Sequence, residues 1–441
     1  MPRKTYSELT RRRFVTAGTV AAALGVAGCS GDGGDGDGGD GGDGGDGGDG
    51  TEAATVEVLH GWTGGDGAEA GEALVAAFEE ESDVTLEFNA IGGGGNENLD
   101  AVVANRLSNN DPPGSFANWP GKNLQRYTGA LGSVDDVWEE EGFADSHIQE
   151  AVDLHQQDGT FRAVPLGSHR LNNLFWNVEV VEEAGVDPSS ITDMSAMVDA
   201  LDAVATETNA VPMTHAMSGT WTTTQLWAAV MLGTEGVDAY TNFIEGSPDR
   251  AAVKSAFEST AEILENYISD DAASLDLTGS NNNIINGDAA FIHQGNWAAG
   301  AYGNAEGFEY EADWGAKAFP GTENMYTLHF DSFLYPGDNP TPEASKEWLR
   351  FVGSEAAQTA FNPPKGSIPT RTDVDLSEFN DYLQDAAADF EEAEHRPPTL
   401  QHGLAVVRET MNALNDVIAD EFTGPYNVEA ATDGFVDAVS N

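Results

Sequence analysis

Cysteine is almost absent from this chain. Cys29 is the only cysteine among 441 residues, so a disulfide within the chain is excluded and a cysteine-ligated metal site is not expected. The sequence therefore predicts no metal site, and it contains no motif that calls for a cofactor.

Basic residues are also scarce. Lys and Arg total 19 against 75 Asp and Glu, which gives a formal net charge of -56. Repulsion from phosphates disfavours nucleic-acid binding by such a chain. A mimic of nucleic acid is an alternative, but the acids are spread through every predicted helix and do not form one tract. Because molar salt shortens the screening length to about 3 Å, such a surface is typical of a halophilic protein.

Beyond its N-terminal segment the sequence contains no run of about 18 apolar residues, which is the length that a membrane-spanning helix needs. Residues 10–15 contain three consecutive arginines before Phe14 and fit the twin-arginine export pattern. A weakly apolar run follows over 14–27, and residues 26–29 look like a lipobox that ends in Cys29. We predict a signal peptide over 1–28 and lipidation of Cys29.

A tether follows the lipobox. Residues 30–50 consist almost entirely of Gly and Asp, so they cannot form a core. Asp35 and Asp37 resemble part of a calcium loop, but the EF-hand glutamate and the apolar residue of the β-roll repeat are missing. We interpret residues 29–53 as a lipidated cysteine and a solvated tether to the outer face of the cell membrane.

About 390 residues remain, which is more than one core usually holds. Strand-like and helix-like runs alternate in the first half, which favours βα units around mainly parallel sheets. The expected strands are at 56–59, 84–91, 115–119, 161–164 and 171–177. The expected helices are at 68–81, 96–109, 194–206, 221–232, 250–267, 342–353 and 403–420. No repeat of fixed period is present.

Aromatic and polar residues recur in turns next to these elements. Trp62 and Asp66 lie in a glycine-rich turn between the first strand and the first helix, where α/β proteins bind ligands. An aromatic face and a carboxylate together suit a sugar, which has apolar C–H faces and many hydroxyls. Similar turns contain Trp119, His169, Trp221, Gln225, Asn296, Trp297, Asp331, Lys365 and His402.

The ordered series of these motifs resembles the sugar-binding lipoproteins of ABC importers, in particular the glucose/mannose-type branch. The series runs through Gly61-Trp62, 161–165, His169-Arg170, 294–297 and 362–368, and the resemblance covers about 56–402. It implies two α/β lobes with a hinge, expected at 54–165 plus 313–360 and at 166–312 plus 361–441. It also implies a monomer that is not an enzyme, grips a mono- or short oligosaccharide and delivers it to permease subunits with a cytoplasmic ATPase.

The resemblance also implies which residues touch the sugar. It assigns this role to Trp62, Asp66, His169, Trp221, the residue before Trp297, Lys365 and His402. This chain departs from the branch at Asn296, where an acidic residue is common, and at Trp119, where a histidine is expected.

Structural roles are the alternative for several of these side chains. His169 and His402 could be buried structural histidines. Trp227 is expected in the core because it has helical spacing and apolar neighbours, and Arg170 is expected to order the hinge.

Two other functions compete with sugar capture. A secreted glycoside hydrolase would need two carboxylates about 5–9.5 Å apart across the scissile bond, and only Asp66 and Asp331 lie in the predicted site turns. A surface carbohydrate-binding adhesin would show β-rich repeats, which this sequence does not contain.

Overall fold

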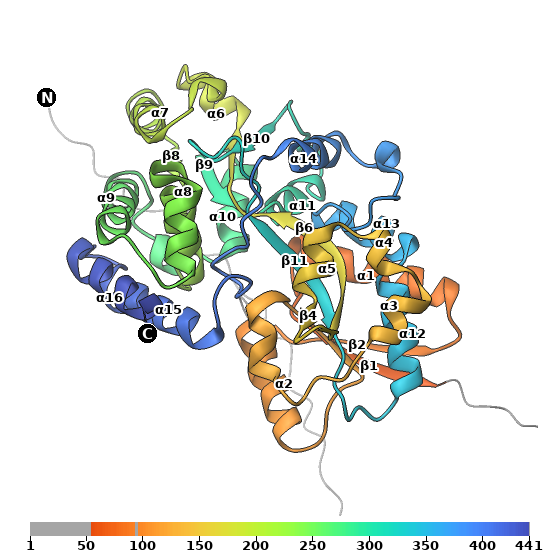
Figure 1. The fold of residues 1–441 in the computed structure, drawn as a ribbon. Helices are drawn as coiled ribbons and strands as arrows, with labels where there is room; N and C mark the ends of the chain where they lie inside the picture. Colours follow the sequence, from red (N-terminus) through yellow and green to blue (C-terminus); the bar gives the residue numbers. More distant parts are fainter. Residues whose placement is uncertain (1–53, 93–95, 441) are drawn as a thin grey trace, which may run out of the picture. The chain divides into compact units, whose positions relative to one another are not determined.

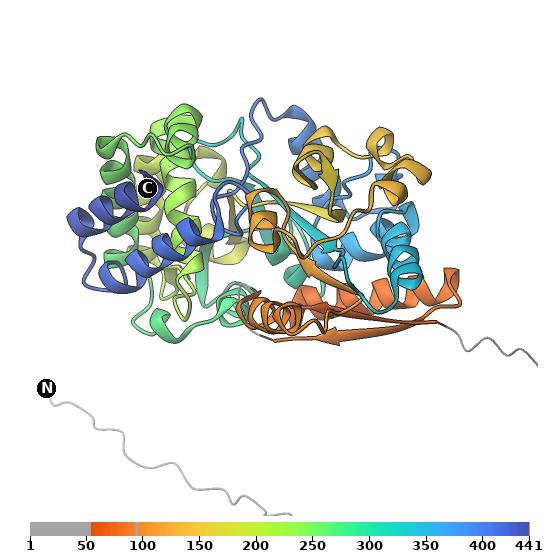
Figure 2. The ribbon, with the colours of Figure 1, turned by 60° about the horizontal axis from the view of Figure 1, so that its bottom comes forward.

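Two mixed β-sheets organise residues 54–92 and 96–440, the part of the chain that the computed structural model describes (Figures 1 and 2). The five-stranded sheet has the order β2-β1-β3-β11-β6, and the four-stranded sheet has the order β10-β7-β9-β8. We call the first sheet with its helices the first lobe, and the second sheet with its helices the second lobe. The predicted signal peptide, Cys29 and the tether lie outside the described residues.

The strands are short, and most are buried. Those of the first sheet are β1 (Thr55–His60), β2 (Thr85–Ala90), β3 (Ser115–Asn118), β6 (Ala163–Arg170) and β11 (Leu328–Leu334). Those of the second sheet are β7 (Asn173–Asn177), β8 (Val211–Met213), β9 (Ala289–Gln294) and β10 (Trp314–Ala318). A separate hairpin joins β4 (Gln156–Gln157) to β5 (Thr160–Phe161).

Helices cover the sheets on both sides (Figure 1). Those that accompany the first sheet are α1 (Gly65–Glu81), α2 (Glu97–Ser108), α3 (Asp135–Glu140), α4 (Phe143–Ser146), α5 (Gln149–Leu154), α12 (Pro342–Val352) and α13 (Glu355–Lys365). Those that accompany the second sheet are α6 (Val178–Glu183), α7 (Met194–Glu207), α8 (Trp221–Ile244), α9 (Arg250–Asn266), α10 (Leu277–Ile285), α11 (Trp297–Gly303), α15 (Arg408–Glu421) and α16 (Val428–Ser440). Helix α14 (Asp381–Glu392) packs on a core that both sheets share.

The two-lobed α/β architecture is confirmed, but the prediction of mainly parallel sheets is wrong. Strand β1 pairs in parallel with β2 and β3, and β8 pairs in parallel with β9. Strand β11 is antiparallel to both β3 and β6, and β7 is antiparallel to both β9 and β10. Strand β11 is antiparallel to β3 because the chain reaches β11 from the second lobe. It therefore enters the first sheet on the side where β1 and β3 end and runs in the opposite direction.

The lobes divide the chain differently from the boundaries expected from the sequence. Strand β10, which the range 313–360 assigned to the first lobe, pairs with β7 of the second sheet. Residues 361–365, assigned to the second lobe, are the end of α13, which packs against α1. The chain completes the second sheet with β10 and only then returns to the first lobe. This crossover therefore lies at 319–327, after β10.

The hinge consists of three crossovers, at 171–172, 319–327 and 393–407, which hydrogen-bond to one another. Asn172 Oδ1 accepts from the Thr327 amide at 2.9 Å, and the Tyr326 amide donates to the His395 carbonyl at 2.9 Å. Arg170 donates to Asp389 at 2.5 Å and to the Met325 carbonyl at 3.2 Å. The expectation that Arg170 orders the hinge is confirmed.

Several local expectations can be compared with the structure. Trp227 is fully buried in the core of the second lobe, as predicted. Helix α15 begins at Arg408 and not at residue 403, because His402 and Gly403 adopt positive φ angles of 75° and 73°. Helix α8 begins at Trp221 as expected and continues past a kink at Gly236.

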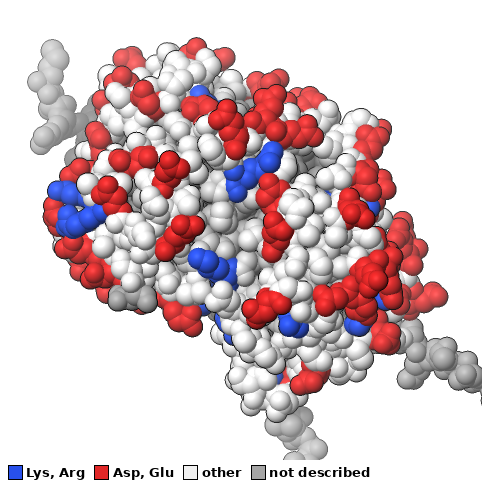
Figure 3. Space-filling model, in the orientation of Figure 1, with Lys and Arg blue, Asp and Glu red and all other residues white. Residues whose placement is uncertain are grey.

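Acidic residues are spread over the visible surface of the molecule. Figure 3 shows Asp and Glu side chains spread over helices of both lobes, with Lys and Arg in a few small groups between them. None of the helices described in the structure has the length and apolar character needed to cross a membrane.

Candidate functional site

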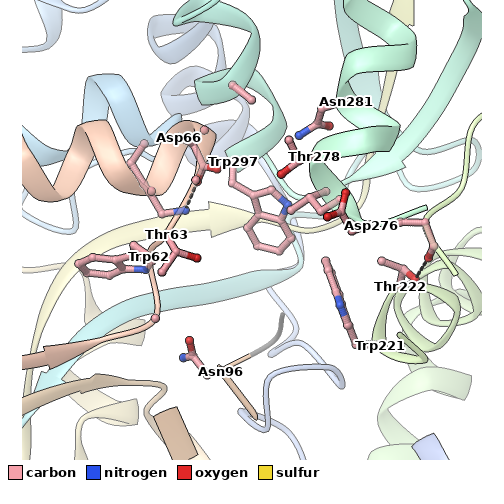
Figure 4. Close-up of a pocket in the computed structure, with 18 of the residues that line it drawn as sticks. Trp62, Thr63, Asp66, Asn96, Trp221, Thr222, Asp276, Thr278, Asn281 and Trp297 are labelled. Atoms are coloured by element: carbon pink, nitrogen blue, oxygen red, sulfur yellow. Dashed lines mark hydrogen bonds and ion pairs between the residues drawn. The ribbon is translucent and has the colours of Figure 1, made fainter. Parts of the chain in front are cut away.

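A cavity of about 820 Å³ lies at the edge of the first sheet where β1 and β3 end and β11 begins. Both lobes line it: the first lobe through the start of α1, the second through the start of α8 and through α10 and α11 (Figure 4). Of the residues singled out in the sequence, those that line the cavity are Trp62, Asp66, Trp119, Trp221, Trp297, Asp331, Lys365 and His402.

Strand direction explains why these side chains meet. The carboxyl ends of the parallel strands β1 and β3 lie at one edge of the sheet, so Trp62 and Trp119 both follow strands that end there. Asp331 was expected in a turn next to a strand, but it lies in the middle of β11, where the pairing with β6 changes register. Because β11 is antiparallel to β3, its start lies at the same edge.

Three tryptophans and a histidine form an aromatic wall in the cavity. The centroid of the Trp297 ring lies 6.3 Å from that of Trp221 and 5.5 Å from that of His402. The centroid of the Trp119 ring lies 4.6 Å from that of His402, in an edge-to-face arrangement with 64° between the ring planes. Trp221 is only half-buried, and Figure 4 shows it beside Trp297 at one end of the cavity. This wall offers apolar ring faces to a ligand.

A buried ion cluster lies beside the aromatic wall. Lys365 Nζ donates to Asp66 Oδ2 at 2.6 Å and lies 3.9 Å from Asp331 Oδ2. The same ammonium lies 5.8 Å from the centroid of the Trp297 ring. Asp66 belongs to the first turn of α1 and Lys365 to the last turn of α13, so the pair ties together two helices of the first lobe.

Burial and charge oppose each other in this cluster. Burial by itself would lower the pKa of Lys365, but Asp66 and Asp331 outweigh it and raise that pKa. Burial would likewise raise the pKa of Asp331, but Lys365 and His169 hold it well below its usual range. Burial raises the pKa of Asp66, although Lys365 opposes the shift. Lys365 and Asp331 are therefore charged at neutral pH.

The histidines near the cluster are neutral. Burial lowers the pKa of His329 to about 4, and burial with the nearby His329 lowers that of His402 well below its usual range. Among the described residues, neither ring nitrogen of His402 has a hydrogen-bond partner, nor does His329 Nδ1. Buried polar atoms are normally paired, so these nitrogens are available to the hydroxyls of a ligand in the cavity.

Three predicted site residues lie behind the cavity wall and do not line it: His169, Gln225 and Asn296. His169 contacts Asp331 through Nε2 at 3.0 Å and the Asn296 side chain through Nδ1 at 2.5 Å. Gln225 contacts Gln294 at 3.5 Å, and Gln294 accepts from the Trp297 indole at 2.9 Å. Their role in the structure is to orient Asp331 and Trp297.

The His169 tautomer decides how Asn296 is turned. Burial lowers the pKa of His169, so its ring is neutral and carries one N–H. If Nε2 donates to Asp331, then Nδ1 is an acceptor and needs the amide NH₂ of Asn296. In the structure Asn296 Oδ1 faces His169 Nδ1 at 2.5 Å, so this tautomer requires the Asn296 amide group to be turned over.

Trp62 differs from the other tryptophans of the cavity. Its ring packs on the core of the first lobe, with centroids 4.9 Å from Phe361 and 5.7 Å from Phe333. A Cβ atom at Gly67 would lie 2.8 Å from the Trp62 Cβ, so only glycine permits α1 to approach this closely. Figure 4 shows the Trp62 ring apart from Trp297 and Trp221, and the side chain is partly buried.

Sequence reasoning missed several residues of the cavity wall. These residues are polar, and the main ones are Thr63, Asn96, Thr222, Asp276, Thr278, Asn281 and Asn282. One signal was available: Asp276 caps α10 by accepting from the Gly279 amide at 2.8 Å, and a run of polar residues follows this cap. A short polar helix is also typical of a solvated surface, so the run by itself does not indicate a site.

The fold and the cavity together define a class. Two α/β lobes that share a hinge and enclose a cavity lined with aromatic and polar side chains are characteristic of a protein that captures a small solute.

Comparisons with known proteins agree with this class. Residues 73–392 match the family described as bacterial extracellular solute-binding proteins. The xylose/arabinose-binding protein of Haloferax volcanii is 49% identical over 87% of this chain and 84% of its own. An uncharacterized ABC transporter extracellular-binding protein of Pyrococcus horikoshii is 31% identical over 86% of each chain. The chain therefore belongs to the bacterial extracellular solute-binding proteins.

Solved structures with this fold include sugar receptors. A chitin oligosaccharide binding protein matches with a TM-score of 0.76 and 17% identity, over 88% of this chain and 98% of its own. A bacterial solute receptor with a preference for β-D-galactopyranose matches with a TM-score of 0.77 and 17% identity over the same shares. At these identities the likeness concerns the fold.

Proposed function

We propose that this protein is the sugar-capturing subunit of an ABC importer and that its ligand is built from pentose units. The name of the Haloferax volcanii relative, at 49% identity over most of both chains, supports the pentose class. The name of the Pyrococcus horikoshii relative supports the ABC transporter context. In this role the protein hands the sugar to permease subunits driven by a cytoplasmic ATPase.

The observation that carries the proposal is the pairing of ring faces with free polar atoms in one cavity. Trp221 and Trp297 offer flat apolar faces, and His402 and His329 offer ring nitrogens without a protein partner. A sugar has both matching features, because its C–H faces pack on aromatic rings while its hydroxyls both donate and accept hydrogen bonds.

Capture follows from the position of the cavity. The start of α1 belongs to the first lobe, and the start of α8 to the second, so a ligand that contacts Asp66 and Trp221 contacts both lobes. Such a ligand favours the conformation in which both sets of contacts are made, which is hinge closure.

Binding without chemistry is part of the proposal. Hydrolysis of a glycosidic bond needs a protonated carboxyl group as general acid. Asp331 is a poor candidate because Lys365 and His169 hold its pKa well below the usual range. Asp66 is engaged by the Lys365 ammonium at 2.6 Å. The relatives, moreover, are named as binding proteins.

A sugar panel in molar salt tests the proposed function. We expect xylose or arabinose, or an oligosaccharide of these, to raise the melting temperature, because a ligand at 100 times its Kd adds about 2.7 kcal/mol of stability. The recovered sugar should be chemically unchanged, and small-angle scattering should show a smaller radius of gyration with the ligand. Cleavage products would refute the binding role, and an unresponsive melting temperature across the panel would refute sugar capture.

The location of the protein is a further part of the proposal. We infer export by the twin-arginine pathway, a lipid on Cys29 and a monomer at the outer face of the cell membrane. The arginine run at 11–13 and the lipobox at 26–29 support the export route and the anchor. Mass spectrometry of the mature N-terminus checks both, since a mature chain that begins elsewhere than at an acylated Cys29 would contradict the anchor.

Stability should depend on salt. Because acidic residues are spread over the visible surface and the net charge is -56, we expect the melting temperature to fall as salt drops from molar to about 0.1 M, where the screening length is about 10 Å. The matched comparison uses sodium chloride against an equal osmolarity of sucrose. A melting temperature that is the same at all salt concentrations would contradict the halophilic interpretation.

A further inference from the structure

The cavity extends beyond the aromatic wall along α10 and α11. Helix α10 presents Leu277, Thr278, Asn281, Asn282 and Ile285 to it, which share one helical face. At 1.5 Å per residue this face is about 12 Å long. In Figure 4, Thr278 and Asn281 lie on one side of Trp297, and Trp221 lies on the other. We call the part along α10 and α11 the outer compartment, and the part beside Trp221 and His402 the inner compartment.

The side chains of the outer compartment suit a second sugar ring. Ala301 and Ala305 are small, so a ring can approach the backbone of α11 and the turn that follows it. Thr278, Asn281 and Asn304 surround them with a hydroxyl and two amides. Amides and hydroxyls both donate and accept, as sugar hydroxyls do.

The outer compartment is held in place by contacts to both lobes, since the Asn304 amide donates to the Pro364 carbonyl near the end of α13 at 3.1 Å. Asn281 Oδ1 accepts from the Tyr302 hydroxyl at 3.4 Å, which links α10 to α11. Strand β9 connects these two helices directly in the chain. The α10 face belongs to a single helix, so its length does not depend on how far the lobes close.

The size of the cavity exceeds the need of one pentose. Its volume of about 820 Å³ falls in the upper part of the range of about 300–1,000 Å³ that is usual for drug-sized ligands. A single pentose is much smaller than such a ligand, and the inner compartment already supplies ring faces and hydrogen-bonding nitrogens for it.

We propose that the outer compartment is a second sugar subsite and that the preferred ligand is a disaccharide or a longer oligosaccharide. One ring lies against Trp221 and Trp297, and the next lies along α10 and α11 beside Thr278 and Asn304. This inference rests on the proposed function, which it narrows from sugars in general to linked sugar units.

Calorimetric titration of the full-length protein in molar salt tests the subsite with xylose and xylobiose. We expect xylobiose to bind at least about tenfold more tightly than xylose, which corresponds to about 1.4 kcal/mol. Glucose and cellobiose serve as a second pair, because the proposal concerns the number of rings and not their identity. A larger affinity for the disaccharide of either pair supports the subsite.

Substitutions in the outer compartment test whether this compartment causes the difference between disaccharide and monosaccharide affinity. Thr278→Ala and Asn282→Ala should each reduce disaccharide affinity several-fold and leave monosaccharide affinity unchanged, because both side chains line the outer compartment. Asn304 is kept, since its amide donates to the Pro364 carbonyl. The control is Asn283→Ala, because Asn283 lies on the same helix but donates to Thr214 and does not line the cavity. The control should leave the ratio of the two affinities as it is in the wild type.

The outcomes separate the two proposals. Equal affinities for one ring and two rings in the wild type, or an unchanged ratio in both outer variants, would overturn the subsite and leave sugar capture intact. If no sugar of either pair binds to the folded wild-type protein, sugar capture itself fails, and the subsite falls with it.

Discussion

Trp221→Ala is expected to weaken sugar binding by roughly tenfold to a hundredfold and to change folding stability little. The ring is half-buried at the start of α8, where it borders the cavity beside Trp297. Removing it takes away a stacking face worth about 1–3 kcal/mol of binding free energy. Calorimetric titration gives the affinity, and thermal melting without ligand gives the stability.

Trp62→Ala is the informative comparison. The Trp62 ring packs against Phe333 and Phe361 in the core of the first lobe. Emptying a fully buried tryptophan site costs about 3–5 kcal/mol of folding free energy, so this partly buried ring should cost an amount near or below the lower end of that range. If Trp221→Ala binds sugar like the wild type, or destabilises the fold more than Trp62→Ala does, the assignment of Trp221 to the sugar is wrong.

Lys365→Met is expected to destabilise the fold by about 3–5 kcal/mol at neutral pH. The change keeps much of the side-chain volume but leaves Asp66 and Asp331 buried without their shared cation, and unpaired buried charges are costly. Lys122→Met is the matched control, because Lys122 is exposed. The control should change stability by less than about 0.5 kcal/mol.

The pH dependence of this variant identifies the cause. In the wild type the pKa of Asp331 is held low, so its stabilising contribution is present above the unfolded pKa of about 3.9 and is lost as pH falls through the lower folded pKa. Without Lys365 the two carboxylates are left buried, and burial raises their folded pKa values. The destabilisation should therefore shrink as pH falls below neutral and the carboxylates take up protons.

Urea unfolding of both variants between neutral pH and about pH 5 measures this effect. Asp66→Asn in the Lys365→Met background should restore part of the lost stability, since it removes one buried charge. A loss for Lys365→Met that is the same at every pH, or no larger than that for Lys122→Met, would show that Lys365 is not the partner that holds the two carboxylates.

The predicted site residues separate according to which way each side chain faces. Trp119, Trp221 and His402 were selected because they lie in turns beside predicted elements, and their rings line the cavity. Asn296 and His169 also lie at ends of elements, yet both are fully buried behind the wall. The position of a residue in the sequence does not show whether its side chain faces a ligand or a neighbouring strand, because register decides that.

The wall formed by α10 shows a second limit. Thr278, Asn281 and Asn282 belong to a short polar helix that has no marked pattern and resembles a surface helix. Only the packing of α10 beside α11 places this face in the cavity.

The sequence by itself determined the class of fold, the order of most strands and helices, the lone cysteine and the acidic composition. These features depend on local periodicity, turn residues and composition, which are properties of neighbouring residues. Tertiary structure alone decided that β11 is antiparallel, that β10 belongs to the second sheet and that Lys365 lies between Asp66 and Asp331. Each of these depends on contacts between segments far apart in the chain, and only the packing of the complete chain sets such contacts.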